Sequence, residues 1–277
     1  MKLYAGDASF VLPLRVEDNS VDLVVTSPPY DNLRSYKDNP DFRFEEVVHY
    51  LCEKVKKGGV VVWVVGDAVA NGSETGSSFY QALYFIKSGW KLHDTMIYEK
   101  NSSSFPASPN GKRYSQMFEY MFVFSNGAPP KSVNLICDKP NNWAGHTPWG
   151  KKTYRHRNGS MIEKDKKQTP VPKFSPRGNI WKYNTGYLQS TKDKVAYNHP
   201  ATMPEKLAQD LVRSYSNKGD LVLDPFCGAG TTLKASKMLG RDFIGIDINE
   251  DYIDICVERL RNTEVQEGLF DENRTES

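Results

Sequence analysis

The chain has 277 residues, of which 39% are hydrophobic and 25% charged, as is usual for a globular protein. This length suits one large domain with an insertion, or two smaller domains. No apolar run approaches the ~18 residues of a membrane-spanning helix, so we expect no membrane association. The four cysteines lie far apart and form no CxxC pair; we therefore expect no metal site, no disulfides and a cytoplasmic location.

The small net charge of +2 hides a strongly basic block. Residues 131–195 carry 14 Lys and Arg against 4 Asp and Glu, a net charge of +10, whereas the rest of the chain sums to −8. Aromatic residues are interleaved with these charges: Trp143, Trp149, Tyr154, Trp181, Tyr183 and Tyr187. A merely solvated loop does not need them, so this block favours a polyanionic partner.

The first half of the chain alternates strand and helix patterns. We predict strands at 3–5, 21–25, 60–65, 95–99 and 118–124, and helices at 44–55 and 77–87. In the second helix, we expect Phe79, Leu83 and Ile86 to form the core face. The continuous apolar run at 60–65 indicates a sheet that is covered on both faces. The last two strands have the order of an antiparallel hairpin.

Regular patterns dissolve after Ser125 and return near Asn198, with 179–183 as the one convincing strand between them. Helices are then predicted at 204–215, 231–239 and 249–261, and strands at 221–224 and 243–247. These elements predict an α/β fold: a Rossmann-like, doubly wound, mostly parallel seven-stranded sheet with an antiparallel hairpin and an irregular insertion. The acidic tail from Thr263 is expected to fray.

The stretch Thr26-Ser27-Pro28-Pro29-Tyr30 directly follows the strand at 21–25. Open α/β sheets bind ligands at the carboxyl ends of their strands. Consecutive prolines make a rigid turn whose carbonyls stay free to accept hydrogen bonds. Acceptors beside an aromatic ring suit a nucleobase with an exocyclic amine, although a plain proline-rich turn is an equal interpretation of this stretch alone.

A second turn, Asp224-Pro225-Phe226-Cys227-Gly228-Ala229-Gly230-Thr231-Thr232, lies between a strand and a helix. Its glycines allow close approach of a ligand to the backbone. Leu233 stands where a dinucleotide-binding loop has a third Gly or Ala, and an acid opens the turn; both features disfavour a pyrophosphate. Asp247, which ends the next strand, is placed to bind the hydroxyls of a ribose.

Together these motifs resemble those of the permuted β group of DNA amino-methyltransferases. The Asp-Pro-Phe-x-Gly-x-Gly-Thr-Thr stretch is similar to their S-adenosylmethionine loop, and Ser27-Pro28-Pro29-Tyr30 is similar to their catalytic motif. The catalytic motif comes first in the chain, as in that group. Further matches are Gly6-Asp7, the run 119–124, His199-Pro200 and the run 204–207.

The resemblance implies roles for individual residues. Ser27, Pro28, Pro29 and Tyr30 would hold a base flipped out of double-stranded DNA. The cofactor S-adenosyl-L-methionine would lie against Asp7, Thr26, His199, Pro200, Pro204, Asp224, Pro225, Phe226, Gly228, Gly230, Thr231 and Asp247. Contacts to nucleic acid are expected from Arg34, Lys151, Lys152, Arg155, Arg157 and Arg177. For the last three, simple phosphate steering is at least as good an interpretation as contact with base edges.

The resemblance divides the chain into a catalytic part (1–125), a target-recognition region (126–197) and a cofactor-binding part (198–262) of one methyltransferase domain. A leading Ser favours N4 of cytosine as the methylated atom; N6 of adenine is the alternative. An RNA amino-methyltransferase and a catalytically silent DNA-binding protein remain rival classes. The resemblance leaves open a homodimer and a restriction endonuclease on a separate chain.

Overall fold

The computed structural model describes residues 1–29, 42–102, 113–147, 152–164 and 169–266. The chain forms two compact units. The main unit comprises Met1–Asn134 and Asn179–Ser277, and the small unit comprises Leu135–Gly178. None of the described helices has the length and apolar content needed to cross a lipid bilayer.

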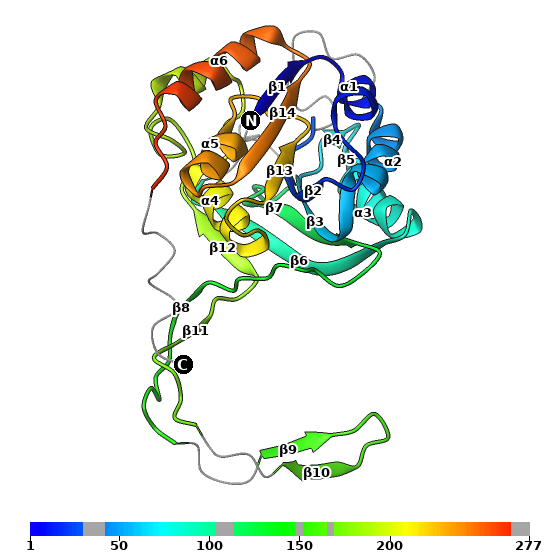
Figure 1. Cartoon of the computed structure of the whole chain (residues 1–277). Coiled ribbons are helices and arrows are strands. Elements are labelled where there is room, and N and C mark those ends of the chain that lie inside the picture. The colour runs from blue at the N-terminus through cyan, green and yellow to red at the C-terminus, as the bar shows by residue number, and fades with distance from the viewer. Residues whose placement is uncertain (30–41, 103–112, 148–151, 165–168, 267–277) are drawn as a thin grey trace. The chain divides into compact units, whose positions relative to one another are not determined.

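The main unit is built on an eight-stranded sheet (Figure 1). Its strands, in spatial order, are β1 (Lys2–Ala5), β14 (Asp242–Asp247), β13 (Leu221–Asp224), β2 (Val21–Thr26), β3 (Val55–Val65), β7 (Phe118–Asn126), β6 (Trp90–Lys100) and β12 (Ile180–Tyr183). All neighbours pair in parallel except β7, which runs antiparallel to both β3 and β6. The sheet therefore carries the predicted antiparallel hairpin.

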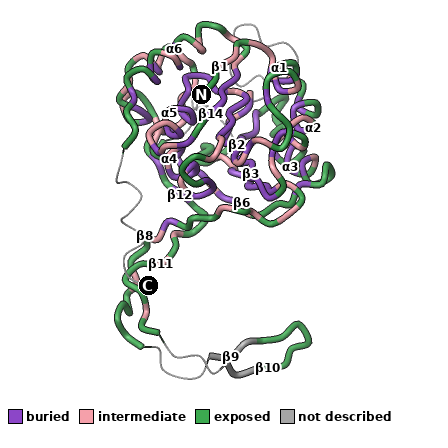
Figure 2. Tube along the Cα trace, in the orientation of Figure 1, coloured by how far each residue is buried: buried purple, intermediate pink, exposed green. Residues whose placement is uncertain are grey.

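Two layers of helices cover the sheet (Figure 1). One layer contains α1 (Ala8–Arg15), α2 (Phe44–Lys54) and α3 (Ser77–Lys87), and the other contains α4 (Glu205–Tyr215), α5 (Thr231–Met238) and α6 (Glu250–Arg261). The central strands β2 and β3 are buried between them, as Figure 2 shows. This arrangement confirms the doubly wound α/β fold, and Leu207, Leu211 and Val212 are buried on α4 as predicted.

The sheet has one strand more than the seven expected. The additional strand is β12, which pairs in parallel with β6 at the edge of the sheet. Its sequence, with Trp181 and Tyr183 buried, was recognisable as a strand. Its partner was not recognisable, because a parallel pairing over such a long connection leaves no local signal.

The predicted core face of α3 is wrong. Phe79, Leu83 and Ile86 are exposed, at 51%, 65% and 43%, whereas Ala82 and Phe85 are buried. Two polar side chains of α3 form hydrogen bonds on the buried side of the helix. Ser78 Oγ donates to Asp67 Oδ2 at 2.5 Å, and Gln81 Oε1 accepts from Trp63 Nε1 at 2.8 Å. These buried hydrogen bonds stabilise the less apolar face against the sheet.

The small unit contains two antiparallel strand pairs. They are β8 (Cys137–Pro140) with β11 (Phe174–Pro176), and β9 (Lys152–Arg155) with β10 (Met161–Lys164). The main unit holds both residues that flank it. Asn134 Nδ2 donates to the carbonyl of Ser216 at 3.0 Å, and Asn179 Nδ2 donates to the carbonyl of Thr95 at 3.0 Å.

The main unit also contains a short strand pair and a short helix. β4 (Val69–Ala70) pairs with β5 (Ser73–Glu74), and the 3-10 helix η1 covers Lys194–Asn198.

Candidate active site

A cavity of about 470 Å³ lies at the carboxyl edge of the sheet in the main unit, within the usual size range of a small-molecule site. Both sequence motifs reach it. The predicted residues that line it are Asp7, Ser27, Pro29, His199, Pro200, Pro204, Asp224, Pro225, Phe226, Gly228, Thr231 and Asp247. Residues from opposite ends of the chain therefore border one space.

The two motifs meet where β2 lies beside β13. Thr26 Oγ1 donates a hydrogen bond of 2.7 Å to Asp224 Oδ1, although 198 positions separate these residues in the chain. Thr232 Oγ1 donates to the carbonyl of Val25 at 3.2 Å, which adds a second link. The proline turn after Thr26 and the glycine turn after Asp224 are thus held side by side.

Asp224 is deeply buried, and its environment changes its acidity. Burial raises the pKa of Asp224 to about 6, although the hydrogen bonds from Thr26 Oγ1 and the Phe226 amide lower it. The pKa is therefore above the value of about 3.9 for an aspartate in an unfolded chain. The folded protein binds this proton more tightly, so Asp224 weakens the fold most above pH 6 and progressively less as the pH falls toward 4.

We expect Asp224→Asn to remove this pH dependence. An Asn Oδ1 can still accept from Thr26 and Phe226. Between pH 7 and pH 4, the free energy of unfolding of the wild type should rise by about 2 kcal/mol relative to that of the variant. Urea unfolding at a series of pH values measures this difference. A difference that stays constant over the range would mean that Asp224 ionises with an ordinary pKa.

The glycine turn is built for close approach. Gly228 has a φ of +49°, and a Cβ at this position would lie 2.8 Å from His199 Nε2. Its amide donates to Asp247 Oδ2 at 2.8 Å, while the Asn249 amide donates to Asp247 Oδ1 at 3.0 Å. Burial raises the pKa of Asp247. A carboxylate has about four acceptor positions, so Asp247 keeps capacity for the hydroxyls of a ligand.

Asp7 and His199 border the same cavity from other elements. Asp7 lies two residues after the end of β1, whose last residue, Ala5, is paired with Asp247. Asp7 Oδ1 caps α1 by accepting from the Ser9 amide at 2.8 Å. Among the described residues, its hydrogen bonds use Oδ1 alone, so Oδ2 remains available to a ligand. The His199 ring packs edge-on against Tyr252 with centroids 4.3 Å apart.

A buried ion-pair network lies beneath the glycine turn, and the sequence did not reveal it. The Arg259 side chain is fully buried; its Nη2 lies 2.6 Å from Glu205 Oε1 and its Nε 3.1 Å from Asp193 Oδ2. Lys234 Nζ contacts the same two carboxylates at 2.9 and 2.7 Å. Burial alone raises the pKa of Asp193, but the Lys234 and Arg259 hydrogen bonds outweigh it and lower the pKa overall.

Arg259 also donates to the carbonyl of Ala229 within the glycine turn. The network therefore connects that turn to the segment 193–205, which carries His199. The available signal was the position of Arg259, which falls on the buried face of α6 together with Ile255 and Cys256. Breaking such a buried pair costs roughly 3–5 kcal/mol, because it leaves a charge without compensation.

Cys227 lies in the glycine turn but is not placed as a nucleophile. It is 5% exposed, and its Sγ lies 3.9 Å from Cys256 Sγ. The hydrogen bond with Cys256 and burial raise the pKa of the Cys227 thiol. Because the reactive form of cysteine is the thiolate, this environment suits packing rather than covalent catalysis.

Not all predicted residues reach the cavity. Thr26, Pro28 and Gly230 are buried behind it, where Thr26 and Gly230 support the two turns. Tyr30, Arg34 and Lys151 lie outside the described residues. The remaining predicted nucleic-acid contacts, Lys152, Arg155, Arg157 and Arg177, belong to the small unit.

Among these residues of the small unit, two differ clearly in environment. Arg155 is exposed at the end of β9. Arg177 instead forms an ion pair with Asp138, to which its Nε donates at 3.1 Å.

The residues present fit S-adenosylmethionine. The backbone at Gly228 leaves room that any side chain would fill, and the carboxylates of Asp7 and Asp247 suit an amine and ribose hydroxyls. Phe226, Pro200 and Tyr252 supply apolar surface to the same cavity. This donor set is the one expected for an adenosine that bears an amino acid.

Comparison with known proteins agrees with this geometry. A family model described as DNA methylase, of the N6 and N4 amino-methyltransferases, matches residues 21–258. The orphan methyltransferase M.BamHII of Bacillus amyloliquefaciens is 51% identical over 247 residues, covering 89% of this chain and 91% of that protein. The type II methyltransferase M.BglII of Bacillus subtilis is 26% identical over 284 residues, covering 99% and 72% of the two chains.

Solved structures show the same fold. TTHA0409 of Thermus thermophilus, in complex with S-adenosyl-L-methionine, has a TM-score of 0.60 at 27% identity and covers 94% of this chain and 95% of its own. The cytosine-N4-specific PvuII DNA methyltransferase has a TM-score of 0.63 at 19% identity and covers 95% and 94%. Together with the cavity, these matches show that S-adenosyl-L-methionine is the cofactor and DNA the substrate. The chain therefore belongs to the family of S-adenosylmethionine-dependent DNA amino-methyltransferases.

Proposed function

We propose that the protein methylates a specific DNA site on the exocyclic amine of a flipped base, with N4 of cytosine as the target. The observation that supports this most directly is the Thr26–Asp224 hydrogen bond, because it joins the residue before the proline turn to the residue that opens the glycine turn. Ser27 and Pro29 border the same cavity as Gly228 and Asp247. A base held by Ser27 would therefore face the cofactor directly.

The chemistry assigned to the proline turn is acceptance of hydrogen bonds. An exocyclic amine is a poor nucleophile, because its lone pair is delocalised into the ring. Ser27 Oγ borders the cavity and would accept one N–H group. The carbonyl of Pro28, which is buried next to Ser27 and would have to become accessible to the base, would accept the other, and the two bonds would favour a pyramidal nitrogen. Pro29 would restrict the turn, and Tyr30 would stack on the ring. When bound, S-adenosylmethionine supplies an activated methyl group on a sulfonium, so alignment is the remaining requirement.

Recognition of the DNA site is assigned to the region 126–197, which includes the small unit. Arg155 and Arg157 are exposed there, whereas Arg177 is engaged with Asp138. Exposed arginines can contact either phosphates or base edges. Lys151, Lys152 and Arg34 are assigned to phosphates, so binding is expected to weaken steeply as salt rises.

The choice of cytosine rests on Ser27 at the head of the proline turn. Digestion of methylated duplex DNA to nucleosides, followed by mass spectrometry, tests it. N4-methylcytosine is the expected product. Detection of N6-methyladenine in its place would show that adenine is the target base. Competition between duplex DNA and structured RNA in the same assay tests the RNA alternative. A protein that binds DNA but transfers no methyl group would be the silent DNA-binding class.

Two associations extend the proposal. The methyl mark would protect its site from a restriction endonuclease carried on a separate chain, although the relative M.BamHII is described as an orphan methyltransferase. Cleavage of methylated and unmethylated DNA by endonucleases of matching sequence tests this protection. A homodimer is the second association, and light scattering of the purified protein with and without DNA measures it.

A further inference from the structure

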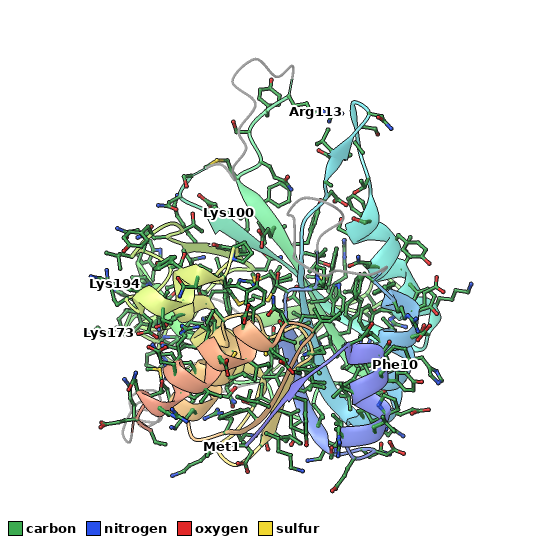
Figure 3. The ribbon with its side chains drawn as sticks, turned by 90° about the horizontal axis from the view of Figure 1, so that it is seen from above. Met1, Phe10, Lys100, Arg113, Lys173 and Lys194 are labelled. Atoms are coloured by element: carbon green, nitrogen blue, oxygen red, sulfur yellow. The ribbon has the colours of Figure 1, made fainter. Side chains whose placement is uncertain are left out.

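The cavity extends beyond the cofactor turn to a second wall, and only one residue of this wall, Glu119, belongs to the motifs found in the sequence. This wall is formed by Tyr98 and Lys100 on β6 and by Glu119 on β7. Strand order explains how they reach the cavity: β7 runs antiparallel to β3, so its first residues and the last residues of β6 lie at the carboxyl edge of the sheet. Figure 3 labels Lys100 at this end of β6.

Strand order also places Ser27 in the middle. In the sheet, β1, β14 and β13 lie on one side of β2, while β3, β7 and β6 lie on the other. Most residues assigned to the cofactor, among them Asp7, Gly228 and Asp247, lie at or just after the ends of the first set. The Tyr98 wall lies on the second side, where a base held by Ser27 would extend.

The hydroxyl of Tyr98 is buried without a hydrogen-bond partner among the described residues. The residue as a whole is 3% exposed. Buried hydroxyls normally have a partner, so an exception beside a cavity points to a ligand. Burial and the nearby Glu119 carboxylate raise the pKa of Tyr98, which keeps the phenol protonated and able to donate.

The remaining charges of the wall are fixed. Lys100 Nζ lies 2.5 Å from Glu119 Oε1, and these side chains are only 9% and 15% exposed. Lys100 Nζ also lies 5.9 Å from the centre of the Tyr98 ring. Because the ion pair and the sheet hold this wall rigid, it is suited to select a ligand by a hydrogen bond.

We propose that Tyr98 is a specificity-determining residue that donates a hydrogen bond from its hydroxyl to the ring nitrogen next to the amine-bearing carbon of the flipped base, N3 in cytosine. The inference rests on the proposed function, since it requires a base held by Ser27. A ring acceptor is the complementary group for a phenol O–H. A site with a buried donor rejects a base that lacks the acceptor, because the donor would be left unpaired.

Tyr98→Phe tests the hydroxyl alone. Removing a buried group that has no partner among the described residues should leave the melting temperature unchanged or raise it. The affinity for S-adenosylmethionine, measured by calorimetry, should stay at the wild-type value. kcat/KM for a duplex that carries the unmethylated target site should fall about ten-fold. Wild-type kcat/KM, or weakened S-adenosylmethionine binding in its place, would overturn the assignment.

Tyr183→Phe is the matched control. The Tyr183 ring lies 6.2 Å from that of Tyr98, but its hydroxyl donates to Asp210 Oδ2 at 2.7 Å, and Tyr183 does not line the cavity. Although Tyr183 falls within 126–197, it is buried in β12 of the main unit and is not among the residues assigned to DNA contacts. This variant should therefore melt at a lower temperature and keep the wild-type kcat/KM. The two tyrosines should therefore show opposite patterns of stability and activity.

A modified base identifies the partner of the hydroxyl. In 3-deazacytosine a C–H replaces N3, so the wild type should lose about ten-fold in kcat/KM on a duplex with this base at the target position. Tyr98→Phe should lose little between cytosine and 3-deazacytosine. Independent, additive losses would show that Tyr98 does not contact N3. Failure of the proposed function is a different result: the wild type would then form no N4-methylcytosine on unmodified DNA.

Discussion

Replacing Ser27 and Tyr30 together with Ala is expected to lower methyl transfer at least ~1000-fold, because both the acceptor of the amine and the stacking surface are lost. Ser27 borders the cavity, and Tyr30 follows the two prolines in the sequence. The loss should appear in kcat as well as in kcat/KM, since the acceptor acts on the reacting nitrogen. Transfer of a labelled methyl group to duplex DNA measures it.

Two controls separate a chemical loss from damage to the fold. The double variant should bind S-adenosylmethionine with the wild-type affinity, because neither residue is assigned to the cofactor. Ser20→Ala makes the same Ser-to-Ala change at the residue that precedes β2, at the end of the strand away from the cavity. There Ser20 Oγ donates to the carbonyl of Glu17 at 2.7 Å. This control should transfer at the wild-type rate. Full activity of the double variant would remove the proline turn from the mechanism.

Gly228→Ala is expected to lower methyl transfer roughly 100-fold through loss of cofactor binding. The new Cβ would meet His199 Nε2 at 2.8 Å, and the φ of +49° is strained for any side chain. The His199 ring is confined by Tyr252, so it cannot move aside freely. Calorimetric titration with S-adenosylmethionine measures the affinity directly, and unchanged affinity would exclude the glycine turn as the cofactor site.

Gly127→Ala is the matched control for backbone strain. Gly127 has a φ of +61°, but a Cβ there would meet nothing within 4 Å. Backbone strain should cost both variants about 1–2 kcal/mol in the free energy of unfolding, and Gly228→Ala should lose more, because its Cβ also meets His199. Only Gly228→Ala should lose the cofactor, because only there does the new side chain fill the cavity.

Much of the fold could be predicted because its strongest signals are local. The valines of β3 form one apolar run, and the glycine and proline turns follow strands directly. The face of α3 could not be predicted, because Phe79, Leu83 and Ile86 show the same helical spacing as the face that is buried. Only the partners of Ser78 and Gln81, which are distant in the sequence, decide between the two faces.

Some residues of the candidate site could be predicted from the sequence and others could not. Ser27, Asp224 and Asp247 could be found because each ends a strand, and parallel strands bring their ends together. Tyr98 and Arg259 could not. The importance of Tyr98 depends on an antiparallel pairing that carries the end of β6 to the cavity. Arg259 depends on carboxylates from two other segments of the chain, Asp193 and Glu205.

The asparagines that flank the small unit have a consequence for evolution and engineering. Asn134 and Asn179 anchor both ends of the intervening segment to the backbone of the catalytic body. If the small unit recognises the DNA site as proposed, we expect that residues 135–178 can be exchanged between homologues as a cassette. A chimaera joined at these two asparagines should then keep its methyl-transfer chemistry and acquire the sequence preference of the donor.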